Sequence, residues 1–463
     1  MAFFTANEFN YFDAIDFRLK VKRLSQLARG DYSCLPRILN EHFPQTDVPI
    51  RTVPFVERYV SETSGVYVRP AQRAFGAALP SDAWAKLQRV YRSSQVDHHM
   101  DSLERMAWVQ QSAWLLVLPG ARMGTVQLRV LDASELEPEV QNWQDAANPD
   151  SWSRVIVRVP VGGNANQVVY GEMHLTPYEA YIIQGGQKVP VFGDSIANPL
   201  GRIPLIALHT VDPEAGRWHA PAHDSLLNLA IAICIQESDT ETLVHYQSWG
   251  QWVISGADIA DLMGAAGKDD PKIPAVSMGV GKVFMLPVSS NPDAAPAKLE
   301  IVQGQPPIAQ ITSWQESRLR LFCSLKGLSA DAFLRTNTAV TASARRVSEH
   351  DRKVIRDRIR PALLRAEQTL AELIASILNV YEIVPIDPNL VDVQVTFQDP
   401  PAIVDPLHDA QATEARARIG VESPVDVIMA EQGIGFAEAR KVWERNMQDA
   451  EMIKGSEKAG ETV

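Results

Sequence analysis

The sequence predicts an α+β fold, because strand-like and helix-like segments occupy separate blocks of the chain. Between residues 126 and 211, the segments VQLRVL, RVIVRVPV, QVVYGEMHLT, EAYIIQGG and IPLIALHTV are short and rich in β-branched residues. Gly, Asn and Pro separate them. Before and after this block, apolar residues recur three and four positions apart, which is typical of helices. Grouped strands flanked by grouped helices indicate an α+β architecture.

The part before the strands should be largely helical. Residues 11–30 and 53–64 carry apolar residues among charged ones, and a helix should begin at Ser81. A further periodic run starts at Met100 and leads into AWLLVLP. This last segment is expected to be a buried strand that ends at Pro119.

Three longer helices are predicted after the strands. The first, residues 224–249, contains LLNLAIAICIQ, which is apolar on nearly every side, so a neighbouring subunit is expected to bury part of it. The second runs from about 307 to 326. The third runs from about 342 to 380 and should be kinked at Pro361, because a proline inside a helix removes a hydrogen bond. Residues 250–305, rich in Gly and Pro, form a small module between the first two helices.

The C-terminal part returns to short elements. VDVQVTF at 391–397 is expected to form a strand. Ser423 and Pro424 fit the N-cap and the first position of a helix, and another helix should follow at 436–452.

Composition limits the classes of protein that the chain can represent. It has 463 residues, of which 46% are hydrophobic and 22% are charged, as in ordinary globular proteins of two or three domains. It contains no run of 18 apolar residues and no basic flank before an apolar start, so neither a membrane span nor a signal peptide is expected. The net charge of −12 disfavours tight binding of DNA independent of sequence, yet lets DNA pass without sticking.

The sequence carries no motif of an enzyme active site or a cofactor site. The sequence lacks a phosphate-binding loop with Gly-Lys-Ser/Thr, a Gly-x-Ser-x-Gly elbow and a Cys-x-x-Cys pair. We therefore expect no cofactor. GGNANQ at 162–167 fits a hairpin turn, since no lysine follows and no helix opens. His219 and His223 have a spacing that could suit a metal, but Pro221 separates them and no third ligand is evident.

The three cysteines, Cys34, Cys234 and Cys323, lie far apart in the sequence. Cys234 and Cys323 stand among apolar residues, which favours buried, reduced thiols. The alternative for a cysteine in this chain is a catalytic nucleophile.

A basic cluster begins the third long helix. Between residues 341 and 366 there are eight basic and three acidic residues, against the acidic balance of the whole chain. One interpretation is a solvated face that pairs with acids of another subunit. The other is direct contact with phosphates. The basic residues are Arg345, Arg346, Arg352, Lys353, Arg356, Arg358, Arg360 and Arg365.

The order of these elements resembles that of portal proteins, the head-to-tail connectors of tailed bacteriophages. LQRVYRSSQVDHHMDSLERMAWVQQSAWLLVLP resembles the helix and strand that open the mixed α/β wing of that family. NPLGRIPLIALHTV, followed by SLLNLAIAICIQESDTETLVHYQSWGQWVISG, resembles the passage from wing to first stem helix to clip. The resemblance covers nearly the whole chain, and it lies in pattern and order, without an invariant motif.

The resemblance implies a division of the chain into seven parts. These are the α/β wing (1–221), the first stem helix (222–249), the clip (250–305), the second stem helix (306–327), the tunnel loop (328–341), the long kinked helix with the wing return (342–404) and the helical crown and tail (405–463).

The resemblance also implies a function, which is not enzymatic. The family forms a dodecameric ring at one capsid vertex of the virion, assembled in the host cytoplasm. Double-stranded DNA enters the ring, driven by the terminase large subunit, and leaves it at infection. Further implied partners are head-tail adaptor, major capsid and scaffolding proteins, with no membrane.

Candidate residues follow from this assignment. The loop LRTNTAV is small and hydroxyl-rich, so Thr336, Asn337 and Thr338 are the candidates for the loop tip in the channel, and Arg335 is the first basic residue expected to reach it. The candidates for contacts between subunits are Leu226, Leu227, Ile231, Ile233, Trp314, Arg345, Arg346 and Arg352.

Two other classes of function remain open from the sequence. One is a different capsid or connector protein without a channel. The other is a hydrolase or transferase whose site uses Cys34 and a remote histidine.

Overall fold

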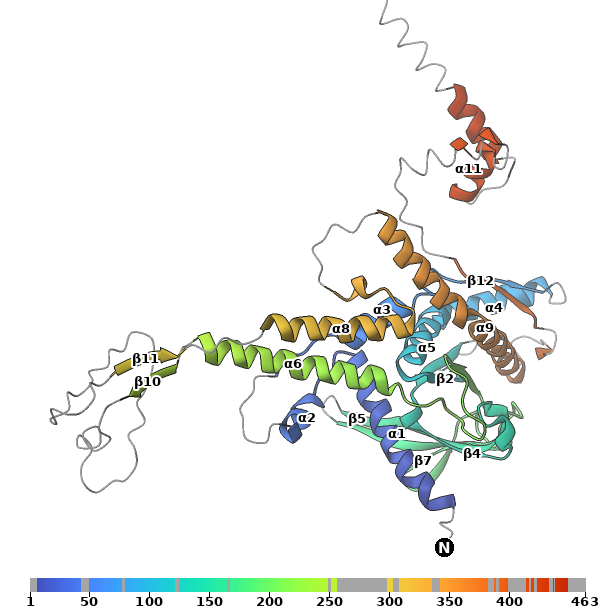
Figure 1. The fold of residues 1–463 in the computed structure, drawn as a ribbon. Helices are drawn as coiled ribbons and strands as arrows, with labels where there is room; N and C mark the ends of the chain where they lie inside the picture. Colours follow the sequence, from blue (N-terminus) through green and yellow to red (C-terminus); the bar gives the residue numbers. More distant parts are fainter. Residues whose placement is uncertain are drawn as a thin grey trace, which may run out of the picture. The chain divides into compact units, whose positions relative to one another are not determined.

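The computed structural model is a mixture of helices and antiparallel sheets, which confirms the predicted α+β composition (Figure 1). It describes residues 6–42, 50–76, 80–120, 125–164, 167–248, 251–255, 298–302, 308–334, 342–381, 387–388 and 391–398, and parts of 414–448. The chain divides into two compact units, Met1–Thr336 with Asp351–Asp399, and Asn337–His350 with Pro400–Val463.

Five of the described helices lie in the N-terminal part of the first unit. The helices predicted at 11–30, at 53–64 and from Ser81 are confirmed, with bounds that differ by a few residues. Pro80 precedes the helix that begins at Ser81, and Gln95, in a left-handed conformation, separates that helix from the next one. The helices are α1 (Ala6–Ala28), α2 (Leu35–His42), α3 (Phe55–Thr63), α4 (Ser81–Ser93) and α5 (Val96–Gln110).

The two larger sheets of this unit are antiparallel, and two further antiparallel strand pairs are described below. The three-stranded sheet has the order β3-β2-β9, and the five-stranded sheet is a meander of β4 to β8. Asn164 pairs with Gln167 across the tip of β5 and β6, which confirms the predicted hairpin turn. The strands are β2 (Ser112–Pro119), β3 (Val126–Leu131), β4 (Leu136–Val140), β5 (Trp152–Asn164), β6 (Gln167–Leu175), β7 (Ala180–Gln184), β8 (Gln187–Pro190) and β9 (Leu205–His209).

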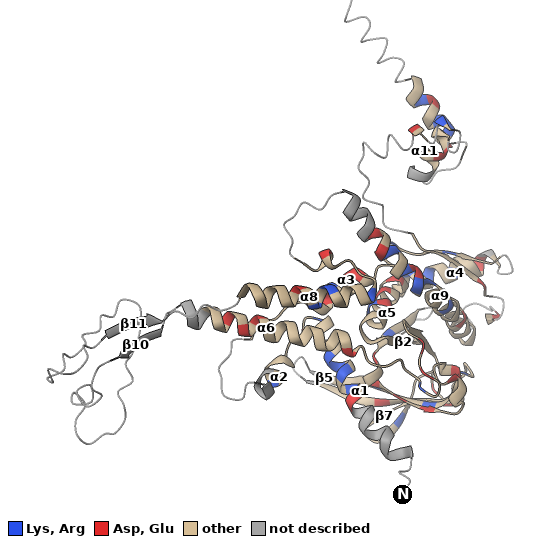
Figure 2. Cartoon of the chain, in the orientation of Figure 1, with Lys and Arg blue, Asp and Glu red and all other residues tan. Residues whose placement is uncertain are grey.

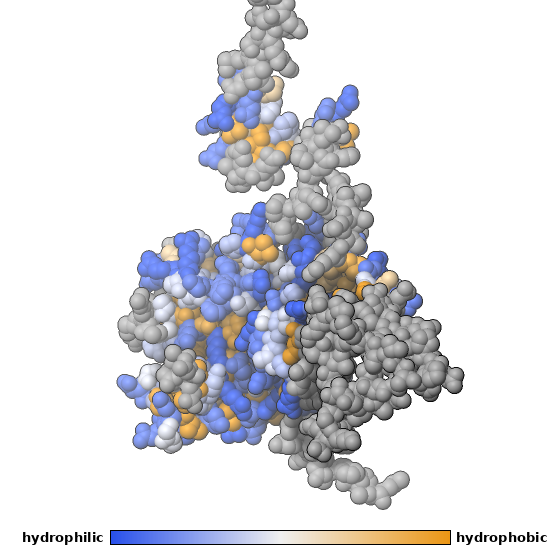
Figure 3. Space-filling model, turned by 90° about the vertical axis from the view of Figure 1, so that its left-hand side faces the viewer, coloured by the Kyte–Doolittle hydropathy of each residue, from blue (hydrophilic) through white to orange (hydrophobic). Residues whose placement is uncertain are grey.

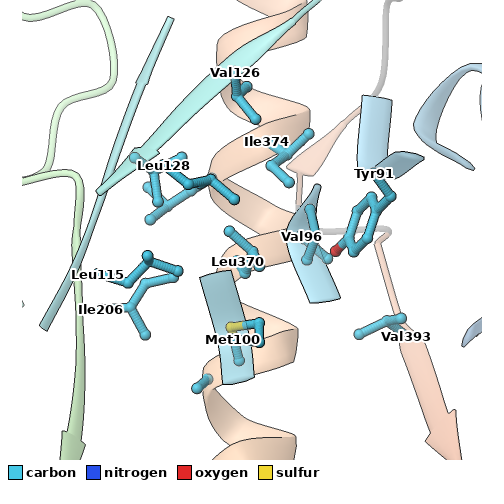
Figure 4. Packing of buried hydrophobic residues seen from close by; sticks show 14 of the residues in the cluster. Tyr91, Val96, Met100, Leu115, Val126, Leu128, Ile206, Leu370, Ile374 and Val393 are labelled. Atoms are coloured by element: carbon cyan, nitrogen blue, oxygen red, sulfur yellow. The ribbon is translucent and has the colours of Figure 1, made fainter. Parts of the chain in front are cut away.

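Strand β2 lies between two hydrophobic cores. Leu115 and Val117 on one face join the cluster that α5 and the long helix α9 (Ala342–Val380) cover (Figure 4). Trp114 and Leu116 on the other face join the cluster with the inner residues of β5. Successive side chains of a strand point to opposite faces, so a strand buried on both faces must be apolar throughout. This explains the uninterrupted sequence AWLLVLP.

A buried ionic cluster holds α9 against strand β1 (Gln72–Phe75), which pairs with β12 (Val393–Thr396). The carboxylate of Glu367 on α9 is fully buried and accepts hydrogen bonds from Arg73 Nη2 at 2.6 Å, Arg73 Nε at 2.9 Å and the Tyr67 hydroxyl at 2.7 Å. Arg73 Nη2 also lies 2.8 Å from Asp97 Oδ1. The buried charge of Glu367 is therefore compensated on both oxygens, as burial of a charge requires.

The three long helices lie where the sequence predicts them. They are α6 (Asp224–Ser248), α8 (Ile308–Lys326) and α9, which contains Pro361. Helical structure is continuous on both sides of Pro361, and the kink there stays a prediction. Strands β10 (Gln251–Ser255) and β11 (Lys298–Val302) pair between α6 and α8, while the rest of the predicted 250–305 module lies outside the described residues. None of the described helices has the length and hydropathy of a membrane span.

The second unit contains helix α11 (Pro424–Gln432) and helical residues 438–448. The predicted cap is confirmed, because Ser423 Oγ accepts from the Asp426 amide at 3.2 Å and Asp426 Oδ2 accepts from the Ser423 amide at 2.9 Å. Each group satisfies a backbone donor that the first turn of a helix leaves free.

Replacing Ser423 by alanine should destabilise α11 by about 1 kcal/mol, because the Asp426 amide loses its acceptor. Amide hydrogen exchange of residues 424–430 should become about fivefold faster. Ser423→Asp keeps an acceptor and should leave the exchange rates nearly unchanged. Equal acceleration in both variants would contradict this role of the cap.

Candidate subunit interface on the helical hairpin

Helices α6 and α8 form a hairpin that carries the β10–β11 pair at its far end (Figure 1). The base of α6 is embedded in a hydrophobic cluster of the same chain, to which α1, α3 and α8 contribute. Leu226 and Leu227 belong to this cluster and are 0% and 3% exposed. The expectation that a neighbouring subunit buries these two residues is therefore wrong, because the chain's own helices surround them. Ile231 and Ile233 are half-buried at the border of the cluster, and their role in an interface stays a prediction.

An extended segment before α3 covers a second face of α6. The amide of Arg51 donates to Ser238 Oγ at 2.9 Å, and the amide of Val53 lies 3.5 Å from Cys234 Sγ. The Arg51 guanidinium pairs with Glu241. Cys234, Ser238 and Glu241 are spaced by four and three residues, so they share one face of the helix. This face is thus occupied by the same chain.

Helix α8 has apolar residues on two faces. Leu319, Phe322 and Cys323 point into the cluster with α3 and α6. Trp314, Leu321 and Leu325 are 51%, 61% and 77% exposed and follow one another at intervals of seven and four residues. At 3.6 residues per turn these three side chains lie within roughly 40° of each other around the helix. We call Trp314, Leu321 and Leu325 the α8 stripe.

The α8 stripe is the strongest signal of a partner on the hairpin. A surface helix normally keeps its apolar residues on the face toward its own core, and an outward apolar row marks a contact with another molecule. Among the residues that the structure describes, the guanidinium of Arg318 lies over the Trp314 ring, with its Cζ 4.7 Å from the ring centroid. On the face that Figure 3 shows, apolar patches lie among hydrophilic ones. The predicted interface residue Trp314 therefore lies on an exposed surface.

One arginine of the basic cluster on α9, Arg352, pairs with an acidic residue of the same chain. Arg352 pairs with Glu62 of α3, whose side chain is buried and also lies 2.8 Å from Arg58 Nη2. Arg352 thus has an acidic partner inside the chain, and its contact with another subunit stays a prediction. Sequence reasoning missed Glu62 because no local spacing connects α3 with α9. The side chains of Arg345 and Arg346 lie outside the described part.

The residues expected to line a channel cannot be placed. Arg335, Thr336, Asn337 and Thr338 all lie outside the described residues, so the channel loop stays a prediction. The structure describes the chain up to Leu334 and again from Ala342, where α9 begins.

The two histidines with metal-like spacing are packed as aromatic rings. His219 stacks on Phe17 with ring centroids 3.6 Å apart, and His223 meets the ring edge of Tyr59 at 5.4 Å. Burial lowers the pKa of His219 to about 4 and that of His223 to about 3, so both are neutral at pH 7. The described residues include no group of three potential metal ligands.

A serine–histidine pair occurs in this unit, but it is part of the packing. Ser112 Oγ lies 2.8 Å from His209 Nδ1 and accepts from the amide of Ala220 at 2.8 Å. Ser112 is 1% exposed, so a substrate has no access to its hydroxyl. The pair joins the start of β2 to β9 and to the segment before α6.

The cysteines lack the environment of a nucleophile. Burial raises the pKa of the thiols of Cys34, Cys234 and Cys323, which opposes formation of the reactive thiolate at neutral pH. Cys234 and Cys323 are buried, as the sequence predicts. The enzyme hypothesis built on Cys34 thus gains no support from its surroundings.

No protein-family model matches the chain, and no curated protein sequence does. Among solved structures, the chain is similar to a chain in the neck of an empty gene transfer agent particle computed with C6 symmetry, with 12% identity over 83% of this chain and 90% of that chain and a TM-score of 0.42. A chain in the neck of the native particle computed with C12 symmetry shows 11% identity over 84% and 89%, with a TM-score of 0.42.

A third similarity is to a chain in the virion of the native gene transfer agent particle, with 13% identity over 79% of this chain and 84% of that chain and a TM-score of 0.38. With TM-scores below 0.5, these similarities establish neither the function of this chain nor its number of subunits.

Proposed function

We propose that this chain is a portal protein, which assembles into a dodecameric ring at one capsid vertex of a tailed phage-like particle. The observation that carries the proposal is the α8 stripe, an exposed apolar row on a helical hairpin whose end bears a strand pair. In this assignment, α6 and α8 are the two stem helices and β10–β11 belong to the clip.

A ring explains why the hairpin keeps apolar residues exposed. Full burial of Trp314, Leu321 and Leu325 against a neighbouring copy would contribute about 1.5–3 kcal/mol for each side chain. Each copy in a ring has two neighbours, so a face that is open in the single chain is covered in the assembly. The base of α6, in contrast, is already buried and anchors the hairpin to the rest of its own chain.

The ring would act as a passive channel. Double-stranded DNA would be driven into it by the terminase large subunit and leave through it at infection, while adaptor, capsid and scaffolding proteins contact its outside. Tight contact with phosphates would slow the moving DNA, and the chain is acidic overall, with Arg352 already paired to Glu62. The purified ring is therefore expected to bind duplex DNA weakly at 0.15 M salt.

Replacing Leu321 and Leu325 together by aspartate should prevent ring assembly. Two carboxylates in the α8 stripe would have to lose water on assembly without gaining a partner, at a cost of several kcal/mol for each contact. Mass photometry of the wild type should show particles far above the 51.2 kDa chain, and the variant should stay at the mass of a monomer.

The matched control is Leu364→Asp, since Leu364 is an exposed leucine on α9, away from the α8 stripe. It should assemble like the wild type. Full-sized rings of the Leu321→Asp/Leu325→Asp variant, or a wild type that stays monomeric at all concentrations, would overturn the proposed function.

A further inference from the structure

A pocket of about 370 Å³ lies between α6 and α8, close to the α8 stripe. Its walls combine an aromatic ring, aliphatic side chains, amides and one carboxylate, which belongs to Asp239. This mixture suits a group with a flat cationic end and an apolar stem. The lining residues are Gln236, Asp239, Thr240, Leu243, Gln310, Ile311 and Trp314.

The carboxylate in this pocket has no cationic partner among the described residues. Among the residues that the structure describes, no hydrogen bond or ion pair reaches Asp239, although it is partly buried. Burial raises the pKa of Asp239 above its usual value, as expected for a carboxylate that loses water without gaining a cation. A positive group entering the pocket would remove this penalty.

The charges of the two helices are complementary. Helix α6 carries four acidic residues and no lysine or arginine, whereas α8 carries Arg318, Arg320 and Lys326 against one acid, Glu316 (Figure 2). Within the chain, the α6 acids at 224 and 241 already pair with residues outside the hairpin, with Lys20 and Arg51. The remaining acids of α6 are Glu237 and Asp239.

Arg320 is the cation of α8 that is available to a neighbour. It is exposed, and its one ion pair with a described residue is a loose one with Glu316, 3.7 Å away on the same helix. Arg318 already lies over the Trp314 ring. Positions 314 and 320 differ by roughly 120° around the helix, so Arg320 points away from the flank that contains the pocket. One hairpin therefore presents a receiving pocket on one flank and a guanidinium on another.

We propose that the pocket takes up the guanidinium of Arg320 from a second copy of this chain, which pairs with Asp239 next to the Trp314 ring. This inference rests on the proposed ring. A contact between two different surface patches is heterologous, and repeated around an axis it closes a ring. The arginine fits better than a lysine because its planar group forms two parallel hydrogen bonds with a carboxylate and stacks on aromatic rings.

The test is a charge exchange in the full chain. Asp239→Arg should bring two guanidinium groups together, and Arg320→Asp should bring two carboxylates together. Each variant should raise the protein concentration needed for half-assembly at least tenfold. The double variant, Asp239→Arg with Arg320→Asp, should restore assembly to within about threefold of the wild type, because the pair is re-formed with opposite polarity. Glu237→Arg is the control, since Glu237 is exposed on α6 and does not line the pocket.

The outcomes separate this inference from the proposed function. A wild type that forms rings while the double variant fails like the single ones would overturn the pairing of Arg320 with Asp239 and leave the ring in place. A wild type without rings would overturn the proposed function itself. Equal loss of assembly in the Glu237→Arg control would also contradict the pocket, because it would show a general effect of charge on α6. Recovery in the double variant shows that the substituted helices fold.

Discussion

Replacing Glu367 by alanine should lower the free energy of unfolding of the first unit by about 3–5 kcal/mol. The substitution leaves the guanidinium of Arg73 buried between β1 and α9 with only the half-exposed Asp97 as a partner, and it removes the acceptor of the Tyr67 hydroxyl. Urea denaturation followed by tryptophan fluorescence measures this loss as a lower midpoint.

Two further variants test whether the loss of stability in Glu367→Ala comes from the unpaired buried charge of Arg73. In Arg73→Met with Glu367→Leu, both charges are replaced by apolar side chains, so most of the stability should return. Glu372→Ala removes a carboxylate of the same helix that pairs with Arg202 at 3.5 Å near the surface, and it should cost less than about 1 kcal/mol. If Glu367→Ala is no worse than Glu372→Ala, the buried cluster does not fix α9 in the way described.

Acidification should destabilise the base of the hairpin through His223. Its folded-state pKa is lowered by burial from 6.5 to about 3, so the unfolded chain takes up a proton at a higher pH than the folded chain. The stability that His223 contributes is therefore complete above pH 6.5 and is lost as the pH falls toward 3. The full loss is on the order of 5 kcal/mol.

The variant His223→Leu isolates this effect, because leucine does not titrate. The difference in unfolding free energy between wild type and variant should change steadily between pH 6.5 and 4, in favour of the variant at the lower pH. Comparison of the two proteins cancels the opposite contribution of Glu104, whose pKa burial raises to about 7. A wild type and a His223→Leu variant with parallel pH profiles would contradict a buried neutral histidine.

The parts of the fold that local patterns determine could be predicted. Strand β2 follows from its uninterrupted apolar sequence, the hairpin of β5 and β6 from GGNANQ, and the start of α11 from Ser423 and Pro424. In each case the signal lies within a few residues, because caps, turns and strand alternation are local effects.

The partners of buried helices and the long-range ion pairs could not be predicted from the sequence, because they depend on contacts between distant segments. The apolar first half of α6 predicts burial but not the partner that provides it, and the partners of Leu226 and Leu227 are α1, α3 and α8 of the same chain. The pairs Arg352 with Glu62 and Arg51 with Glu241 likewise join elements far apart in the sequence. Trp314 was already an interface candidate from the sequence. Only the structure shows that Leu321 and Leu325 are exposed on the same face of α8 and form a row with it.

Negative-stain electron microscopy of the purified full chain tests the central claim most directly. We expect rings with a central hole, formed by many copies of the 51.2 kDa chain, in which the α6–α8 hairpins of neighbouring copies touch through the α8 stripe. Class averages that show twelve repeats would match the proposed dodecamer. The proposal would be contradicted if the protein, even at high concentration, appeared as single chains or as compact oligomers without a central hole.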